Sequence, residues 1–331
     1  MADNFWPGRK VLVTGCTGLL GSWLTEALLD VGADVVGLVR DSVPRSRLIE
    51  EKIIDRISVV WGGVENYPLV ARALNEYEVN IVFHLAAQTV VSVANQNPLP
   101  TLEANIRGTW NVLEACRCSS NLKSIVVASS DKAYGAHSVL PYDEEASLEG
   151  SHPYDVSKSC VDLLARAYAK TYGLPLGITR FGNLFGGGDL NFSRLIPGTI
   201  SSVICGKAPE IRSDGLFTRD YVYVEDAARA YLLLGEKIAT VPDKFGGEPF
   251  NFSYESPKTA LEVAQKIVSL MKRDDLHPKI LNVATNEIPH QYLSSRKARE
   301  WLHWEPVFTF EQGLHRTIAW YREFFQKTGL G

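Results

Sequence analysis

Short, uniformly apolar segments alternate with longer segments of helical spacing over the first half of the chain. The apolar segments are rich in Val and Ile and lack the polar alternation of a strand with one exposed face. They read "KVLVTG", "ADVVGLV", "RISVVWG", "NIVFHLAA", "KSIVVASS" and "PLGITRF". Segments such as "LLGSWLTEALLDVG" and "TLEANIRGTWNVLEACR" lie between them and have the spacing of amphipathic helices. This alternation predicts an α/β fold with a doubly wound parallel sheet that is covered by helices on both faces.

The pattern changes after about residue 185, where loop-rich segments interrupt the alternation. Two helical segments follow, "TALEVAQKIVSLMKR" and "EQGLHRTIAWYREFF". We therefore predict a first domain of residues 1–185, with residues 220–246 crossing back to it, and a smaller mixed α/β domain of residues 186–219 and 247–331 that binds the substrate.

Composition and charge argue against several classes of protein. A formal net charge of -4 without a long basic run argues against nucleic-acid binding. No apolar run reaches membrane-spanning length, and the N-terminal segment lacks the apolar core of a secretory signal. The five cysteines are scattered without C-x-x-C spacing, so we expect no metal site. These features are typical of a cytoplasmic protein with reduced thiols.

The first apolar segment ends in the glycine turn "TGCTGLLG", directly before an amphipathic helix. In this context Gly15 permits a tight turn, Gly18 lets the backbone approach a pyrophosphate, and Gly21 lets helix and strand pack closely. The N-terminus of the helix favours the bound anion. The turn therefore predicts a Rossmann-type dinucleotide site, although glycines can also serve a tight turn alone. The other cofactor contacts expected here and after the fourth strand are Thr17, Leu19, Leu20, Leu85, Ala86 and Ala87.

The end of the second strand bears on the choice of cofactor. An acid at this position binds the ribose hydroxyls of NAD, whereas an arginine favours the phosphate of NADP. Here Arg40 and Asp41 are adjacent. The sequence thus leaves NADP open, and we favour NAD.

Tyr154 and Lys158 lie four residues apart at the start of a predicted helix, and so on one face of it. A tyrosine is a poor base at neutral pH, but a nearby ammonium and a positively charged nicotinamide ring stabilise its phenolate. Ser130 follows the fifth apolar segment, where the carboxyl ends of parallel strands meet. Together these three residues predict catalysis of hydride transfer at the dinucleotide site.

These motifs are similar to those of the extended short-chain dehydrogenase/reductases, the group of NAD-dependent nucleotide-sugar epimerases and dehydratases. The similarity runs nearly end to end, through "TGCTGLLG", "HLAAQ", "NIRGTWNVLEAC", "SSDKAYG", "YDVSK", "RFGNLFGGGD", "RDYVYVEDAARA" and "KAREWLHWEP". It implies that Ser130, Tyr154 and Lys158 oxidise C4 of a bound nucleotide-hexose. It also implies a homodimer formed through a four-helix bundle. The substrate contacts expected are Gln88, Asn183, Arg194 and Arg219.

The residues after Ser130 separate the reactions of this group. Epimerases usually have small or apolar residues there, whereas this chain has Asp131 and Lys132 and resembles the CDP-glucose 4,6-dehydratases. Elimination of water needs an acid for the departing C6 hydroxyl, here Asp131, and a base for the C5 proton, here Lys132. We therefore predict a nucleotide-sugar 4,6-dehydratase. The alternatives are a 4-epimerase, in which Asp131 and Lys132 form only a structural ion pair, and a non-catalytic dinucleotide-binding regulator.

Overall fold

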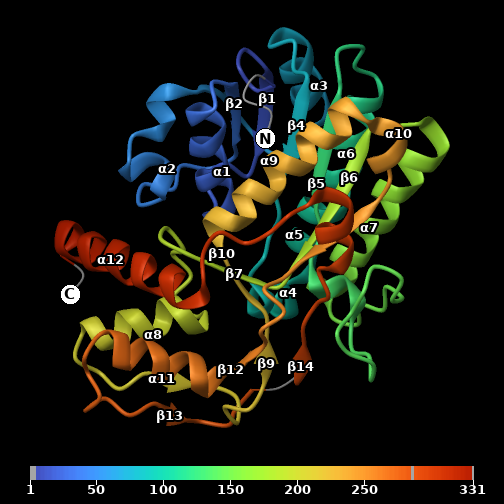
Figure 1. Ribbon diagram of the computed structural model, residues 1–331. Coiled ribbons are helices and arrows are strands. Elements are labelled where there is room, and N and C mark those ends of the chain that lie inside the picture. The colour runs from blue at the N-terminus through green and yellow to red at the C-terminus, as the bar shows by residue number, and fades with distance from the viewer. Residues whose placement is uncertain (1–4, 285–286, 330–331) are drawn as a thin grey trace.

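The computed structural model of the protein describes residues 5–284 and 287–329. At its centre is a seven-stranded sheet in which every strand runs parallel to its neighbours (Figure 1). In spatial order the strands are β11 (Pro249–Phe252), β6 (Leu176–Phe181), β5 (Ser124–Ala128), β4 (Ile81–His84), β1 (Lys10–Thr14), β2 (Asp34–Val39) and β3 (Ser58–Trp61).

Helices cover both faces of this sheet because successive strand residues point to opposite sides. Val11 and Val13 of β1 pack into the core with α1 (Leu19–Asp30) and α9 (Val224–Thr240). Leu12, between them, packs on the other side with the remaining long helices of this half. These are α3 (Tyr67–Glu76), α6 (Gly108–Arg117) and α7 (Pro153–Tyr172). The arrangement confirms the predicted doubly wound, Rossmann-type fold.

Shorter helical elements connect these layers. They are α2 (Arg47–Glu50), η1 (Ile53–Arg56), α4 (Val91–Gln96), α5 (Pro98–Leu102), the π-helical turn η2 (Glu103–Arg107), the 3₁₀ turn η3 (Asp131–Tyr134), α10 (Pro242–Phe245) and the π-helical turn η4 (Ala298–Leu302). Of these, η3 follows β5 directly and begins the candidate site.

The C-terminal lobe consists of α8 (Leu195–Ile204), α11 (Ala260–Leu270) and α12 (Phe310–Thr328) with short strands between them (Figure 1). It has an apolar core of its own, in which Ile200, Ile267 and Leu314 are fully buried. Its strands pair as β10 (Tyr221–Tyr223) with β7 (Asn183–Phe185), β9 (Thr218–Arg219) with both β12 (Lys258–Thr259) and β14 (His290–Gln291), and β13 (Lys279–Ile280) with β8 (Glu210–Ile211).

The edge strand β11 comes from a segment that the sequence places in the smaller domain. It lies in the large sheet because its alternate residues Phe250 and Phe252 are fully buried there. The Phe252 ring stacks on Phe181 of the neighbouring β6, with centroids 4.9 Å apart. Residues 249–252 thus belong to the large sheet, and the chain returns to the C-terminal lobe after them.

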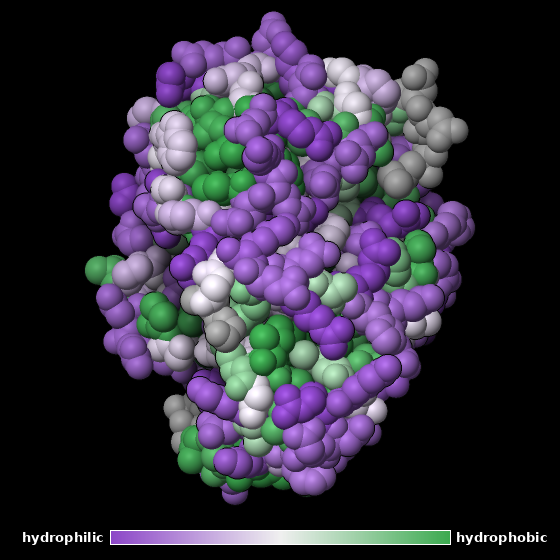
Figure 2. All heavy atoms as spheres, turned by 90° about the vertical axis from the view of Figure 1, so that its left-hand side faces the viewer, coloured by the Kyte–Doolittle hydropathy of each residue, from purple (hydrophilic) through white to green (hydrophobic). Residues whose placement is uncertain are grey.

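The order of the strands reverses between β1 and β4, since the chain continues from β1 toward one edge and from β4 toward the other. In an open parallel sheet, ligands bind in the crevice at the carboxyl ends of the strands on either side of such a reversal. None of the described helices has the length and apolarity needed to cross a membrane. The side to the left in Figure 1 is largely hydrophilic, with apolar side chains in separate patches (Figure 2).

Candidate active site

The glycine turn has the close contacts that its sequence predicts. Gly15 has a positive φ of 74°, and a Cβ placed on it would lie 2.8 Å from the backbone nitrogen of Ala86. A Cβ on Gly21 would overlap the carbonyl oxygen of Gly15. Both positions therefore need glycine, the first for its conformation and contact with the segment after β4, and the second for the packing of α1 on the turn.

Gly18 is the N-cap of α1 and is exposed at the end of β1. Among the described residues, and apart from its chain neighbours, the one atom within 4 Å of a Cβ built there is the carbonyl oxygen of Gly15, at 3.4 Å. The space above Gly18 and the free N–H groups of the helix therefore fit a dinucleotide pyrophosphate. Thr17, Leu19 and Leu20 are partly buried beside it.

The end of β4 lies against the same turn. The Thr14 hydroxyl accepts hydrogen bonds from the backbone N–H groups of Leu85 and Ala86, each at 3.1 Å. The structure thus brings Leu85 and Ala86 to the glycine turn, and Ala87 follows them in the chain. Arg40 and Asp41 lie at the end of β2 and form an exposed ion pair with each other, with 2.6 Å between Nε and Oδ2.

Tyr154 and Lys158 both lie buried at the start of α7. The Lys158 ammonium donates a hydrogen bond to the carbonyl oxygen of Ala128 at the end of β5 (2.8 Å), and burial lowers its pKa to about 8. Burial raises the pKa of Tyr154 to about 12, although the positive charge of Arg194 and a hydrogen bond with Ser130 both act to lower it. A positively charged nicotinamide ring would act in the same direction as Arg194. The structure thus brings Ser130, Tyr154 and Lys158 together.

Asp131 and Lys132 begin the 3₁₀ turn η3, and their side chains point to different partners. The Ser130 hydroxyl donates to Oδ1 of the buried Asp131 carboxyl at 2.9 Å. The Lys132 Nζ donates to Oε1 of Gln291 at 2.5 Å. Within residues 5–284 and 287–329, Asp131 and Lys132 do not form an ion pair with each other. Their arrangement therefore does not support the structural ion pair as an explanation of this dipeptide.

The protonation of these two groups is shifted in opposite senses. Burial raises the pKa of the Asp131 carboxyl, although the charge of Lys132 opposes it. Burial lowers the pKa of the Lys132 ammonium, although the charge of Asp131 opposes it. A carboxyl that retains its proton and an amine that loses its own are suited to act as a general acid and a general base.

A family model described as the NAD dependent epimerase/dehydratase family matches residues 11–251. The chain belongs to this family. The description agrees with the prediction from the sequence and confirms NAD as the cofactor.

Known relatives of the chain include dehydratases and epimerases. The CDP-glucose 4,6-dehydratase of Salmonella typhimurium is 30% identical, with 98% of this chain and 93% of that protein covered. The dTDP-glucose 4,6-dehydratase of Bacillus anthracis, solved in complex with NAD, has a TM-score of 0.86 at 27% identity and covers 98% of this chain and 100% of its own. The UDP-glucose 4-epimerase of Thermotoga maritima has the same TM-score at 25% identity, with coverages of 95% and 99%.

The residues expected to contact the substrate lie in different surroundings. Arg219, on β9, is buried near Asp131 and Lys132 and donates to the carbonyl oxygen of Pro289 at 2.9 Å. Arg194 is the N-cap residue of α8 but makes no side-chain capping hydrogen bond, and its Nη1 lies 3.2 Å from Oδ2 of Asp189. The positive charge of Arg194 acts to lower the pKa of Tyr154, so the two residues lie in one region of the structure.

The other two expected contacts are Asn183 and Gln88. Asn183, exposed on β7, forms a hydrogen bond with Tyr221 of the neighbouring β10. Both polar ends of the Gln88 side chain are bound to the backbone of Val90, which leaves fewer groups of Gln88 for a ligand.

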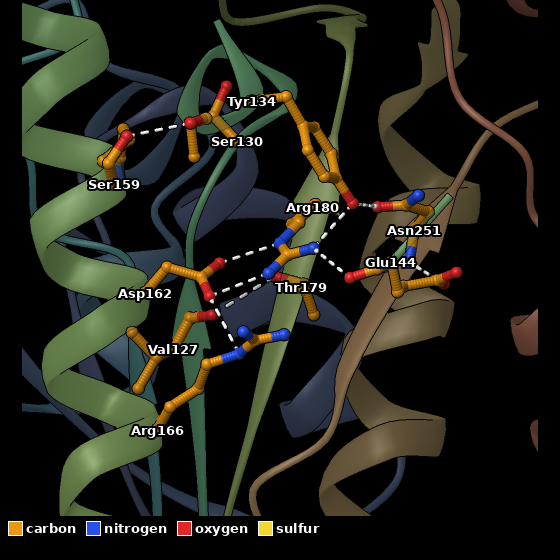
Figure 3. Close-up of polar contacts among 12 residues, drawn as sticks. Val127, Ser130, Tyr134, Glu144, Ser159, Asp162, Arg166, Thr179, Arg180 and Asn251 are labelled. Carbon is orange, nitrogen blue, oxygen red and sulfur yellow. Dashed lines mark hydrogen bonds and ion pairs between the residues drawn. The ribbon is translucent and has the colours of Figure 1, made fainter. Parts of the chain in front are cut away.

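A buried polar network connects the turn η3 to helix α7 (Figure 3). At its centre Arg180 of β6, fully buried, donates from Nε and Nη2 to the Asp162 carboxylate of α7, both at 2.8 Å. Its Nη1 donates to the hydroxyl of Tyr134, the last residue of η3, at 2.6 Å. That hydroxyl donates in turn to Asn251 of β11 at 2.8 Å. The network fixes the turn with the proposed acid and base relative to the helix with the tyrosine and lysine.

The sequence did not reveal the roles of Gln291, Arg180 and Asp162. Gln291 is 159 positions from Lys132 in the chain, and Arg180 is 18 positions from Asp162. None of the three lies in a local pattern that predicts a site. The described residues contain no cluster of three or more His, Cys, Asp or Glu side chains that could hold a metal ion.

Proposed function

We propose that the protein is a nucleotide-sugar 4,6-dehydratase of the CDP-glucose 4,6-dehydratase type. The observation that carries the proposal is the arrangement of Asp131 and Lys132 beside Ser130, with separate partners and with pKa values shifted toward an uncharged acid and an uncharged base. An epimerase needs neither group, because a C4 ketone has only to rotate before it is reduced on its other face. The similarity to the Salmonella typhimurium enzyme supports the same reaction.

In the first step Tyr154 removes the proton of the C4 hydroxyl, to which Ser130 holds a hydrogen bond. NAD, which Gly15, Gly18 and Gly21 would hold at the end of β1, would supply the acceptor for the C4 hydride and the source of the hydride for C6. Lys158, fixed to the end of β5 through Ala128, stabilises the phenolate of Tyr154. The product of this step is a 4-keto sugar, whose C5 proton is acidified by the neighbouring ketone.

In the second step the uncharged Lys132 removes the C5 proton, and Asp131 protonates the C6 hydroxyl as it leaves as water. The hydride then returns to C6, and C5 regains a proton from Lys132, which yields the 4-keto-6-deoxy sugar nucleotide. Each positioned acid or base contributes about 10²- to 10⁴-fold to such a step.

We also propose how the rest of the chain serves this reaction. Residues 1–185, with 220–246, hold the cofactor, while residues 186–219 and much of 247–331 hold the nucleotide sugar through Arg194 and Arg219. Asn183, near the end of the first of these segments, also contacts the sugar. The protein is cytoplasmic and forms a homodimer through α6 and α7. The apolar side chains of Trp110 on α6 and Leu163 on α7 support this interface, since they are 44% and 55% exposed in the single chain.

The test is the mass of the product formed from CDP-, dTDP-, UDP- and GDP-hexoses. Loss of one water from one of these substrates is the expected result, and that substrate identifies the base of the nucleotide. A product of unchanged mass and altered configuration would refute the dehydratase and establish the 4-epimerase instead.

Two variants test the assigned steps. Asp131→Asn and Lys132→Met should each slow the elimination by about 10²- to 10⁴-fold. Both should still oxidise C4, so the absorbance of reduced cofactor should accumulate after substrate is added. Lys52→Met removes a lysine from the exposed surface and should behave as the wild type. Full elimination rates in both site variants would show that these residues are not the acid and the base.

A further inference from the structure

Gln291 lies where the C-terminal lobe meets the turn that contains the proposed acid and base. It is the last residue of β14, which pairs in parallel with β9, and its side chain is fully buried. Its amide contacts two consecutive residues of the turn. Oε1 accepts from Nζ of Lys132 at 2.5 Å, and Nε2 donates to the backbone carbonyl oxygen of Asp131 at 2.9 Å.

The two contacts fix the orientation of the amide. A backbone carbonyl oxygen can only accept a hydrogen bond, so the group of Gln291 that faces Asp131 must be the NH₂ group. The amide oxygen therefore faces Lys132, to which it offers an acceptor in either protonation state of the amine. A neutral amine that donates to this oxygen still has its lone pair for a proton of the substrate.

The charge of the side chain at position 291 affects the protonation of Lys132, just as its position affects where the amine lies. Lys132 already lies near three carboxylates and one guanidinium, and each added negative charge would favour the ammonium form. These groups are Asp131 in η3, Asp155 on α7, Glu287 just before β14, and Arg219 on β9. A glutamate at position 291 would place a fourth carboxylate in direct contact with the amine, whereas the amide binds the amine without a net charge.

We propose that Gln291 is a positioning residue for Lys132, which holds the amine beside the acid with an uncharged group so that the lysine can act as a base. This inference rests on the proposed dehydratase function and assigns the base its partner. One side chain from the C-terminal lobe thereby fixes both members of the acid–base pair, since it binds the side chain of one and the backbone of the other.

Two variants separate positioning from charge. Gln291→Met removes both hydrogen bonds at similar volume, and it should lower the elimination rate by about 10²-fold, as a misplaced catalytic group does. Oxidation at C4 should persist, so reduced cofactor should accumulate and KM should change little. Gln291→Glu retains an acceptor for Lys132 but adds a charge, and it should move the acid limb of the kcat profile upward by about 1–3 pH units. Gln326→Glu adds the same charge on the exposed face of α12 and should leave the profile unchanged.

The protonation of Lys132 can also be measured without turnover. Peptide mass spectrometry measures how far Lys132 is acetylated, relative to the exposed Lys52, at each of several pH values. Since only the unprotonated amine reacts, this ratio reports the unprotonated fraction of Lys132. In Gln291→Glu the pH at which Lys132 becomes reactive should rise, and in Gln326→Glu it should not.

The outcomes distinguish the two proposals. A wild-type product with the mass of the substrate overturns the dehydratase function. If the wild type releases water but both Gln291 variants keep its elimination rate and its acid limb, the role of Gln291 is overturned while the dehydratase function stands. A slowed elimination in Gln291→Met together with a raised acid limb in Gln291→Glu supports both.

Discussion

Replacement of His84 should make the protein less sensitive to acid. His84 ends β4 with its ring buried between two threonine hydroxyls, with Nδ1 2.9 Å from Thr14 and Nε2 2.9 Å from Thr109. The Thr109 hydroxyl donates to the carbonyl oxygen of Asn105, so it must accept from His84, and the neutral ring has its proton on Nε2. A second proton would have to go onto Nδ1, where the Thr14 hydroxyl already donates. Charging this ring therefore breaks a buried hydrogen bond.

The size of the effect follows from the pKa of this histidine. Burial, helped by the charge of Lys158, lowers the pKa of His84 from 6.5 to about 3. Between these values the unfolded chain binds a proton that the folded protein does not, so stability rises with pH and is lost as the pH falls from 6.5 toward 3. A pH of 4 is about 2.5 units below the pKa of the histidine in the unfolded chain. At about 1.36 kcal/mol per unit, the protein therefore loses about 3 kcal/mol of its free energy of unfolding.

The assay is equilibrium unfolding in urea at several values of pH from 7 to 4. His84→Gln retains a donor toward Thr109, and His84→Asn retains an acceptor toward Thr14; neither side chain titrates. Between pH 7 and pH 4 the wild type should lose about 3 kcal/mol more than either variant. His315→Gln, at an exposed position of α12, is the control and should follow the wild type. If the wild type and the His84 variants lose the same free energy of unfolding between pH 7 and pH 4, His84 is not the source of the acid sensitivity.

Three further predictions follow from packing and charge. Gly21→Ala should destabilise the protein and abolish cofactor binding, because the added Cβ overlaps the carbonyl oxygen of Gly15. Thermal unfolding and the fluorescence of added reduced cofactor measure these two effects. Asp162→Asn should cost about 3–5 kcal/mol in urea unfolding because it leaves the buried guanidinium of Arg180 without its carboxylate, and a paired Asp162→Leu, Arg180→Met variant should cost less than the sum of the two single changes. Leu163→Glu should convert the proposed homodimer into a monomer, as judged by light scattering, with little change in thermal stability.

The fold and the first half of the site could be predicted because their determinants are local in the chain. The glycine turn, the strand ends and the Tyr154–Lys158 spacing each lie within a few residues, and a parallel sheet brings the carboxyl ends of its strands to one edge. Gly15 and Ser130 could thus be placed at one crevice from the order of the elements alone.

Other parts of the structure depend on contacts between distant segments. Gln291 is separated from Lys132 by 159 residues and belongs to a strand of two residues, too short for any periodic pattern. The change of pattern after residue 185 predicts that residues 249–252 belong to the smaller domain, yet they form the edge strand β11 of the large sheet. It joins the large sheet because Phe252 finds a stacking partner in Phe181, a pairing that single-segment patterns do not contain.

The sequence also left open whether Asp131 and Lys132 are a structural pair or an acid and a base. Adjacent residues of opposite charge are easily taken as partners, but their backbone decides where they point. In a 3₁₀ turn with three residues per turn, successive side chains leave the axis about 120° apart. Asp131 accordingly points to Ser130, and Lys132 points away from it to Gln291. The turn thus keeps the side chains of these two neighbours out of direct contact with each other, as the proposed roles of acid and base require.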